Sequence, residues 1–168
     1  MTASFPGGVA LSDLEVYDTE SSDGCRGGTP HLHTVSSEGY VVVGGAGAVQ
    51  TLSASGFDEH PLQPGDVLSF TPGTVHRLVN GGGLRLLVVM ANAGLPEAGD
   101  AVFTFPAEVR ADAAAYRQAA MLPEGEGRDA AVRARRELAL AGFAELQAGG
   151  VDAVRSLHAD AVRLVAPR

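Results

Sequence analysis

Four side chains in two short stretches of this sequence have the types and spacing of a metal site. His31 and His33 lie two residues apart, so on a β-strand both side chains project from one face. Glu38 follows His33 at an odd offset, and it reaches the same point only if a turn lies between them. His76 follows the Pro-Gly pair at 72–73, a turn signal that can return a distant strand to this point. Three imidazoles and one carboxylate are suitable ligands for a first-row metal ion.

This ligand set predicts a catalytic rather than a structural metal site. Four protein ligands on a six-coordinate ion would leave two positions open for water, a substrate or dioxygen, and open positions distinguish catalytic sites from closed ones. Burying three histidines and a glutamate without an ion would be costly. We therefore predict one divalent metal ion, for which the ligand types favour iron or manganese and do not separate them from zinc, nickel, cobalt or copper.

The elements that would position these residues are short strands separated by turn residues. Alternation of apolar and polar residues predicts strands over residues 11–18, 31–35, 39–43, 48–53, 58–62, 67–70, 75–79 and 84–90, with one more over 101–105. The segments GGAG, ASG, QPGD, TPG and NGGG between them are predicted turns. Strands of this length and spacing are typical of a β-sandwich or barrel.

The pattern changes after residue 105 to Ala- and Arg-rich segments with helical periodicity. Helices are predicted over 107–121, 129–147 and 151–165, and the last carries a clear apolar face. We therefore predict a β-barrel domain over residues 1–105 and a helical extension over 106–168. The extension could cover an open sheet face, form a dimer contact or close over the site as a lid. Its apolar face favours permanent packing.

Two segments carry the signatures of a known family. The stretch PHLHTVSSEGYVVVGG holds His31, His33, Glu38 and Gly45, and the stretch GDVLSFTPGTVHRLVN holds Gly65, Asp66, Pro72, Gly73, His76 and Asn80. Together they resemble the two signatures of the cupin superfamily, over residues 26–92. The resemblance implies a mainly β fold, the double-stranded β-helix or jelly-roll barrel, with a metal ion in its mouth held by His31, His33, Glu38 and His76. The chain departs from the pattern at Cys25 and Thr71, both in loops.

Strand alternation places further side chains near the predicted site. Tyr40 shares a face with Glu38 and is expected either to act with it in catalysis or to fill the barrel. Arg77 is expected to point outward to the surface, and Asn80 to close the turn before the NGGG segment. Other candidates for the pocket lining are Val42, Gln50, Phe70, Leu78 and Met90.

Three residues that could bind metal or react are expected to lie outside the site. His60 is predicted to be an exposed loop residue. His158 is predicted to face solvent, and it would approach the site only if the last helix folded over the barrel mouth. Cys25 is expected to be a small buried residue rather than a reactive thiol.

Charge and composition narrow the class of function. The net charge is −8 and no basic stripe is present, which argues against nucleic acid and anionic membranes as partners. The sequence shows neither a secretory signal nor an apolar run long enough to span a bilayer, and its single cysteine excludes an internal disulfide, so a cytoplasmic protein is expected.

The function predicted from these features is that of a metal-dependent enzyme for a small organic molecule. A dioxygenase-type oxidoreductase is our first choice, although no arginine can be assigned to hold 2-oxoglutarate. The alternatives are a metal-assisted isomerase, epimerase or lyase, and a non-catalytic binding or sensor protein. A homodimer is the expected assembly.

Overall fold

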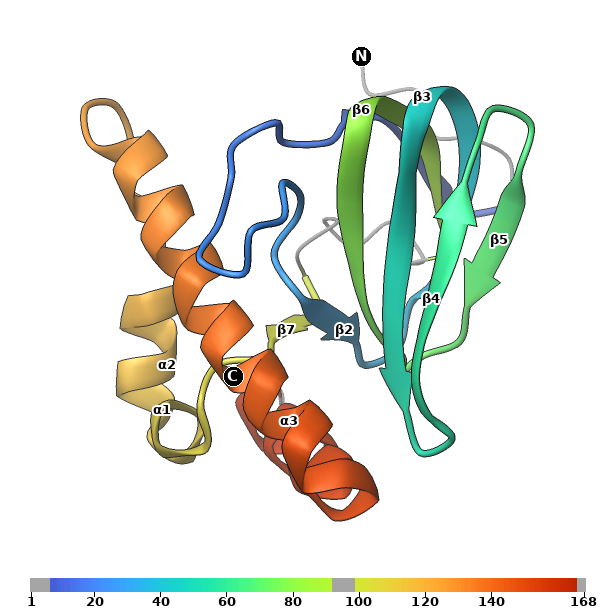
Figure 1. Ribbon diagram of the computed structural model, residues 1–168. Helices are drawn as coiled ribbons and strands as arrows, with labels where there is room; N and C mark the ends of the chain where they lie inside the picture. The colour runs from blue at the N-terminus through green and yellow to red at the C-terminus, as the bar shows by residue number, and fades with distance from the viewer. Residues whose placement is uncertain (1–6, 92–98, 166–168) are drawn as a thin grey trace.

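The computed structural model describes residues 7–91 and 99–165. It consists of an antiparallel β-barrel and a group of helices that lies against one side of it, as Figure 1 shows. The seven strands are β1 (Val9–Glu15), β2 (His31–His33), β3 (Ser37–Ser53), β4 (Gly56–Leu62), β5 (Val67–Phe70), β6 (Val75–Ala91) and β7 (Ala101–Phe103).

The two long strands, β3 and β6, form the frame of the barrel. The main path of the sheet runs β4-β3-β6-β2-β7, with β1 paired to β6 and β5 paired to β3. Every pairing between the strands is antiparallel. The predicted jelly-roll barrel with a C-terminal helical part is therefore confirmed.

Two of the predicted turns are wrong. The GGAG and NGGG segments lie inside β3 and β6, where the strands keep pairing through a series of register shifts between residues 42 and 47. Gly45 has a φ of 71°, and a Cβ on it would lie 2.1 Å from the carbonyl oxygen of Gly83. The glycines thus allow two long strands to bend while in contact, which is the role of β-bulges in barrels. Composition alone does not separate such a bulge from a turn.

The helices are α1 (Ala107–Ala111), α2 (Ala113–Ala120) and α3 (Arg128–Val165). The single helix predicted over 107–121 is divided at Asp112, whose extended backbone ends α1 and whose side chain accepts hydrogen bonds from the N–H groups of Ala114 and Ala115. This is an N-cap, and it starts α2. The AGG corner predicted between the last two helices is present, because Gly150 interrupts α3 with a φ of 63° and a ψ of −150°.

The apolar side chains form two cores. One fills the barrel and includes Val42, Val49, Leu86 and Met90. The other lies between the barrel and the helices, where Leu32, Val75 and Val102 from the strands meet residues of α2 and α3: Tyr116, Ala139, Phe143, Leu146, Val154, Leu157 and Ala161. Burying one side chain such as Leu157 contributes about 1.5–3 kcal/mol, so the helices are an integral layer of the fold. The domain boundary at residue 105 stays a prediction.

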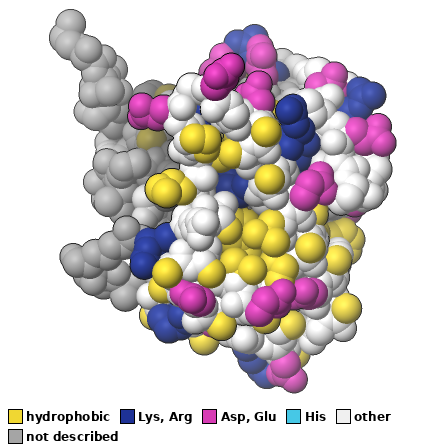
Figure 2. Space-filling view, turned by 90° about the vertical axis from the view of Figure 1, so that its left-hand side faces the viewer, with side chains coloured by type: hydrophobic (Ala, Val, Ile, Leu, Met, Phe, Trp, Pro, Cys, Tyr) yellow, Lys and Arg dark blue, Asp and Glu magenta, His cyan; other side chains and the backbone are white. Residues whose placement is uncertain are grey.

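The outer face of the helical layer is partly apolar. Figure 2 shows hydrophobic side chains gathered on this side of the molecule, and Met121, directly after α2, is 72% exposed. The homodimer predicted from the sequence stays a prediction. Among the described residues no helix is both long and apolar enough to cross a membrane.

Candidate metal centre

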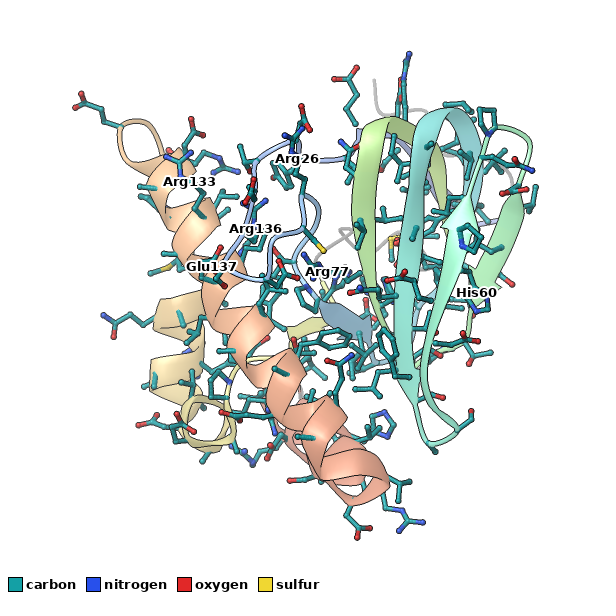
Figure 3. The ribbon with its side chains drawn as sticks, in the orientation of Figure 1. Arg26, His60, Arg77, Arg133, Arg136 and Glu137 are labelled. Carbon is teal, nitrogen blue, oxygen red and sulfur yellow. The ribbon has the colours of Figure 1, made fainter. Side chains whose placement is uncertain are left out.

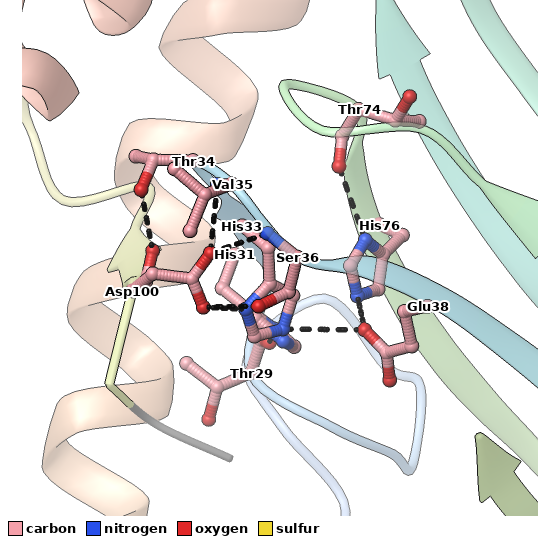
Figure 4. Close-up of polar contacts among 10 residues, drawn as sticks. All are labelled: Thr29, His31, His33, Thr34, Val35, Ser36, Glu38, Thr74, His76 and Asp100. Carbon is pink, nitrogen blue, oxygen red and sulfur yellow. Dashed lines mark hydrogen bonds and ion pairs between the residues drawn. The ribbon is translucent and has the colours of Figure 1, made fainter. Parts of the chain in front are cut away.

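The structure brings the four predicted ligands together at one end of the barrel. One donor atom from each of His31, His33, Glu38 and His76 lies within 4.8 Å of the others. Figure 4 shows these side chains gathered together with their polar contacts. His31 and His76 are direct partners in the antiparallel pairing of β2 with β6. The chain bends at residues 34–35 and re-enters a strand at residue 37, which places Glu38 beside the histidines. The turn predicted between His33 and Glu38 is therefore present.

Each histidine is held from behind through Nδ1. His31 Nδ1 lies 2.9 Å from the carbonyl oxygen of Thr29, and His76 Nδ1 lies 3.1 Å from the carbonyl oxygen of Thr74. A carbonyl oxygen only accepts, so Nδ1 carries the proton in both rings. In a neutral ring this leaves Nε2 as a lone-pair donor toward the cluster. Such outer hydrogen bonds are typical of histidines that bind metals.

The third histidine is held by a carboxylate that the sequence analysis missed. His33 Nδ1 lies 2.9 Å from Asp100 Oδ1. The other oxygen of Asp100 accepts hydrogen bonds from the N–H groups of Val35 and Ser36, both at 2.8 Å. Asp100 therefore fixes the His33 ring and the bend between His33 and Glu38 together. It is 67 residues from His33 in the sequence and belongs to no local pattern, so only the pairing of β2 with β7 reveals it.

The ligand atoms lie close to one another, but two of them have no hydrogen-bond partner. Glu38 Oε2 lies 3.2 Å from His33 Nε2 and 2.9 Å from His76 Nε2. Nevertheless, Glu38 Oε2 and His76 Nε2 are buried and make no hydrogen bond of acceptable geometry. Unsatisfied buried polar atoms are expensive in a folded protein. An ion between these donors would remove that cost, so the residues present fit a divalent metal.

The protonation states of the cluster follow from burial and charge. Burial lowers the pKa of His31 to about 3, and the nearby His76 acts in the same direction. Burial alone would raise the pKa of Glu38, but the adjoining rings of His33 and His76 hold it well below its usual range. For His33, burial is outweighed by Glu38 and Asp100, which raise its pKa. The two carboxylates thus favour the protonated form of His33, and a metal ion bound there would compete with that proton.

The cluster opens into a cavity of about 360 Å³. All four predicted ligands line it, together with Tyr40, which the sequence had placed on the Glu38 face. The wall also includes Phe103 of β7 and Arg135 of α3. A cavity of this size suits a small organic molecule.

The prediction that Arg77 lies at the surface is wrong. The residue is 2% exposed and not at the surface, because the loop before β2 covers it and Asp23 of that loop forms an ion pair with it. Figure 3 shows Arg77 between the barrel and the helices. Strand alternation correctly predicts that Arg77 points away from the barrel interior. It does not predict that another segment of the chain covers that side of the strand.

The prediction that His158 faces solvent is wrong, whereas His60 is exposed as predicted. His158 is partly buried, and its Nε2 lies 2.8 Å from the carbonyl oxygen of Gly73, in the turn that leads to His76. It does not line the cavity. His60 is exposed on the outside of the barrel (Figure 3). It lies on β4, as the strand predicted over residues 58–62 requires, and not in a loop.

The remaining candidates have mainly structural contacts. Phe70 stacks on the His76 ring with a centroid distance of 4.8 Å, whereas Gln50 donates a hydrogen bond to Glu59 on the sheet surface. The Asn80 carboxamide accepts from the N–H groups of Gly82 and Leu84, as its predicted structural role requires. Leu78 lines the cavity, and Val42 and Met90 belong to the barrel core. Cys25 is half-buried.

Comparison with known proteins identifies the barrel. Residues 22–90 match the family model described as Cupin domain. This part of the chain, which holds the four predicted ligands, is therefore similar to a cupin domain. No curated protein matches the chain.

Several solved structures are similar to part of this chain at low sequence identity. One is the WlaRB TDP-quinovose 3,4-ketoisomerase from Campylobacter jejuni, with 16% identity, a TM-score of 0.41, and coverage of 49% of this chain and 62% of the other. A second is QdtA, a sugar 3,4-ketoisomerase from Thermoanaerobacterium thermosaccharolyticum in complex with TDP. It has 13% identity and a TM-score of 0.44, and the match covers 55% of this chain and 64% of QdtA. A third is the nucleoside dehydratase Pac13 from Streptomyces. It has 17% identity and a TM-score of 0.39, and the match covers 52% of this chain and 62% of Pac13. The chain thus spans less than two thirds of each of these proteins.

Proposed function

We propose that this cupin is a metal-dependent enzyme that acts on a small organic molecule in the cavity beside the cluster. The observation that carries the proposal is the convergence of His31, His33, Glu38 and His76, with buried donors that lack hydrogen bonds. The metal would be a single divalent ion, with iron or manganese favoured by the mixed histidine and carboxylate ligands. When bound, such an ion polarises an oxygen atom of the substrate.

The chain itself supplies groups for proton transfer next to this ion. Tyr40 lines the cavity and follows Glu38 by two residues on β3, so both side chains project toward it. A tyrosine or carboxylate in this place can hold or move a proton of the substrate. The reaction class that these groups support is a metal-assisted isomerisation, epimerisation or elimination.

The second candidate is the dioxygenase predicted from the sequence. The same four residues would hold the ion, and the ion would supply the redox chemistry for a reaction of the substrate with dioxygen. The similar structures carry the names of ketoisomerases and a dehydratase, but a likeness at this level concerns the fold.

Metal analysis tests the proposal first. Protein purified without added metal should contain close to one divalent ion per chain, and His76→Ala should reduce that content to about a tenth or less. His60→Ala is the matched control, since His60 is exposed and far from the cluster in the sheet, and it should leave the content unchanged. Wild-type protein without a stoichiometric ion, also after metal loading, would contradict the proposal.

Oxygen dependence then separates the two reaction classes. An isomerase, epimerase or lyase should turn over anaerobically and accept more than one divalent ion, whereas a dioxygenase loaded with Fe(II) should consume oxygen only in the presence of its substrate. For the first class, Tyr40→Phe should lower turnover by at least about tenfold, because general acid–base groups contribute that much or more. Its metal content should stay at the wild-type value.

A further inference from the structure

Arg135 connects the C-terminal helix to the metal cavity. It lies on α3, outside the matched cupin domain, yet its side chain lines the same cavity as the four predicted ligands. The cation also contacts Phe103, with the guanidinium carbon 4.5 Å from the ring centroid. The Phe103 ring lies in turn 6.3 Å from the ring of His31. One aromatic ring therefore separates the guanidinium from the cluster.

The charge of Arg135 is poorly compensated by the protein. Its Nε is buried and makes no hydrogen bond, and Nη1 makes a single long one, 3.3 Å to the carbonyl oxygen of Ala120. No carboxylate in the described part of the chain forms an ion pair with it. Burial accordingly lowers its pKa, although an arginine of this kind stays charged.

Other buried arginines of this protein are better paired than Arg135, although Nε of Arg77 and Arg136 and Nη2 of Arg77 also lack hydrogen bonds. Arg77, which lines the same cavity, pairs with Asp23, and Arg110 pairs with Asp160 at 3.1 Å. Arg136, the next residue on α3, donates to the carbonyl oxygen of Gly27 and the hydroxyl of Thr19. Arg135 is thus the cavity arginine whose charge remains available. A half-buried cation without an anion in a ligand cavity is a binding group for an anionic ligand.

We propose that Arg135 binds a carboxylate of the small molecule whose other end reaches the metal cluster, so that the substrate is an organic acid. The inference rests on the proposed function and deepens it. It gives α3 a direct part in substrate selection, in addition to its part in the core. The guanidinium forms two parallel hydrogen bonds with a carboxylate in the favoured arrangement, and this geometry discriminates strongly against uncharged analogues.

A pair of metal-chelating probes tests this. The monohydroxamate of succinic acid offers a hydroxamate to the metal and a carboxylate at its far end, and its methyl ester lacks only the charge. Isothermal titration on the metal-loaded protein should show Arg135→Gln weakening the acid probe by about tenfold or more, as expected for a lost charge-assisted hydrogen bond. The affinity of Arg135→Gln for the ester should stay within about twofold of the wild-type value, because the ester makes no charged contact with Arg135.

Arg133→Gln is the matched control, because Arg133 is exposed on the same helix (Figure 3) and its loss changes the net charge equally. It should alter neither affinity. Equal weakening of the acid and the ester by Arg135→Gln would show a purely structural role, and no weakening of either would show no role; both results overturn the inference. If Arg135→Gln does not fold, Arg135→Met, which keeps the stem beside Phe103, takes its place under the same criteria.

A second arm separates this inference from the proposed function. Metal-free protein is titrated with succinate and with dimethyl succinate. If neither hydroxamate binds the wild-type protein, the proposed metal site is contradicted. The succinate titration then still tests whether Arg135 binds a carboxylate. Succinate binding that Arg135→Gln weakens and Arg133→Gln preserves supports the inference. Succinate that binds both variants alike, or does not bind the wild-type protein, overturns it.

Discussion

His158 on α3 donates a hydrogen bond from Nε2 to the carbonyl oxygen of Gly73, at 2.8 Å. Gly73 in turn donates its own N–H to the carbonyl oxygen of His33, also at 2.8 Å. One glycine with a φ of 85° thus lies between the C-terminal helix and a predicted ligand. The turn that leads to His76 is thereby fixed from two sides.

Replacing His158 by alanine should destabilise the protein without emptying the metal site. His158→Ala loses one partly buried hydrogen bond, so the free energy of unfolding should fall by about 1 kcal/mol. No metal donor is lost, and the metal content should equal that of the wild type. Urea unfolding and metal analysis of the same preparations measure both. A metal content as low as that of His76→Ala would contradict this assignment.

Asp100→Asn should weaken metal binding although Asp100 is not itself a ligand. The carboxylate holds the His33 ring and the bend before Glu38, and loss of such an outer partner lowers metal affinity by about 10–100-fold. Competition with a chelator of known affinity measures this. Asp112→Asn makes the same chemical change at an exposed helix cap and should bind metal normally. An unchanged affinity for Asp100→Asn would show that the His33 ring needs no such support.

Much of this site can be predicted from the sequence, because its ligands sit in short local patterns. The His-x-His pair and the bend before Glu38 are readable from strand alternation, and His76 follows a recognisable turn. Asp100 and Arg135 are not readable in this way. Each reaches the site only through tertiary contacts, one by the pairing of β7 with β2 and the other by the packing of α3.

The errors in the fold have a similar origin. Alternation gives the side of a strand from which Arg77 projects, but not that a distant loop carrying Asp23 covers that side. The glycine-rich segments of β3 and β6 resemble turns in composition, and only their mutual contact, with Gly45 against Gly83, makes them bulges. Long-range packing thus decided what local sequence left open.

Asp23→Asn should destabilise the protein and change its response to acid. Arg77 is almost fully buried, so removal of the charge on its partner leaves a cation without compensation; we expect a loss of about 2 kcal/mol at neutral pH, less than for a fully buried pair because Asp23 is 34% exposed. The exposed pair Asp18 and Arg26 provides a control, and Asp18→Asn should cost less than about 0.5 kcal/mol.

The sign of the pH dependence follows from the same pair. Burial of Asp23 is outweighed by the hydrogen bonds from Arg77 and Cys25, which lower its pKa in the folded state. Its contribution is therefore complete above the unfolded pKa of about 4 and is lost as the pH falls through the lower folded pKa. The difference in unfolding free energy between wild type and Asp23→Asn should shrink in that acidic range. A difference that stays constant down to about pH 2, near the lower limit of Asp titration, would contradict the pairing.

Gly142→Ala should destabilise the protein, against the usual preference of helices for alanine. A Cβ at residue 142 would lie 2.0 Å from the carbonyl oxygen of Thr104, so α3 would have to move away from the segment that follows β7. Overpacking of this kind costs about 1–3 kcal/mol, whereas Gly→Ala at an exposed helix position gains about 1 kcal/mol. Thermal unfolding decides the sign. The exposed neighbour provides the comparison, since Ala141→Gly should cost about 1 kcal/mol.

The division of the cavity wall between barrel and helix also sets an order in time. All four predicted metal ligands precede residue 77, and Arg135 is nearly sixty residues further along the chain. During synthesis the ribosome therefore releases the complete set of ligands before the arginine that faces them and before the helical layer that shares their core. A metal ion can meet its donors while the cavity still lacks one wall, and the wall that selects the organic ligand is added last.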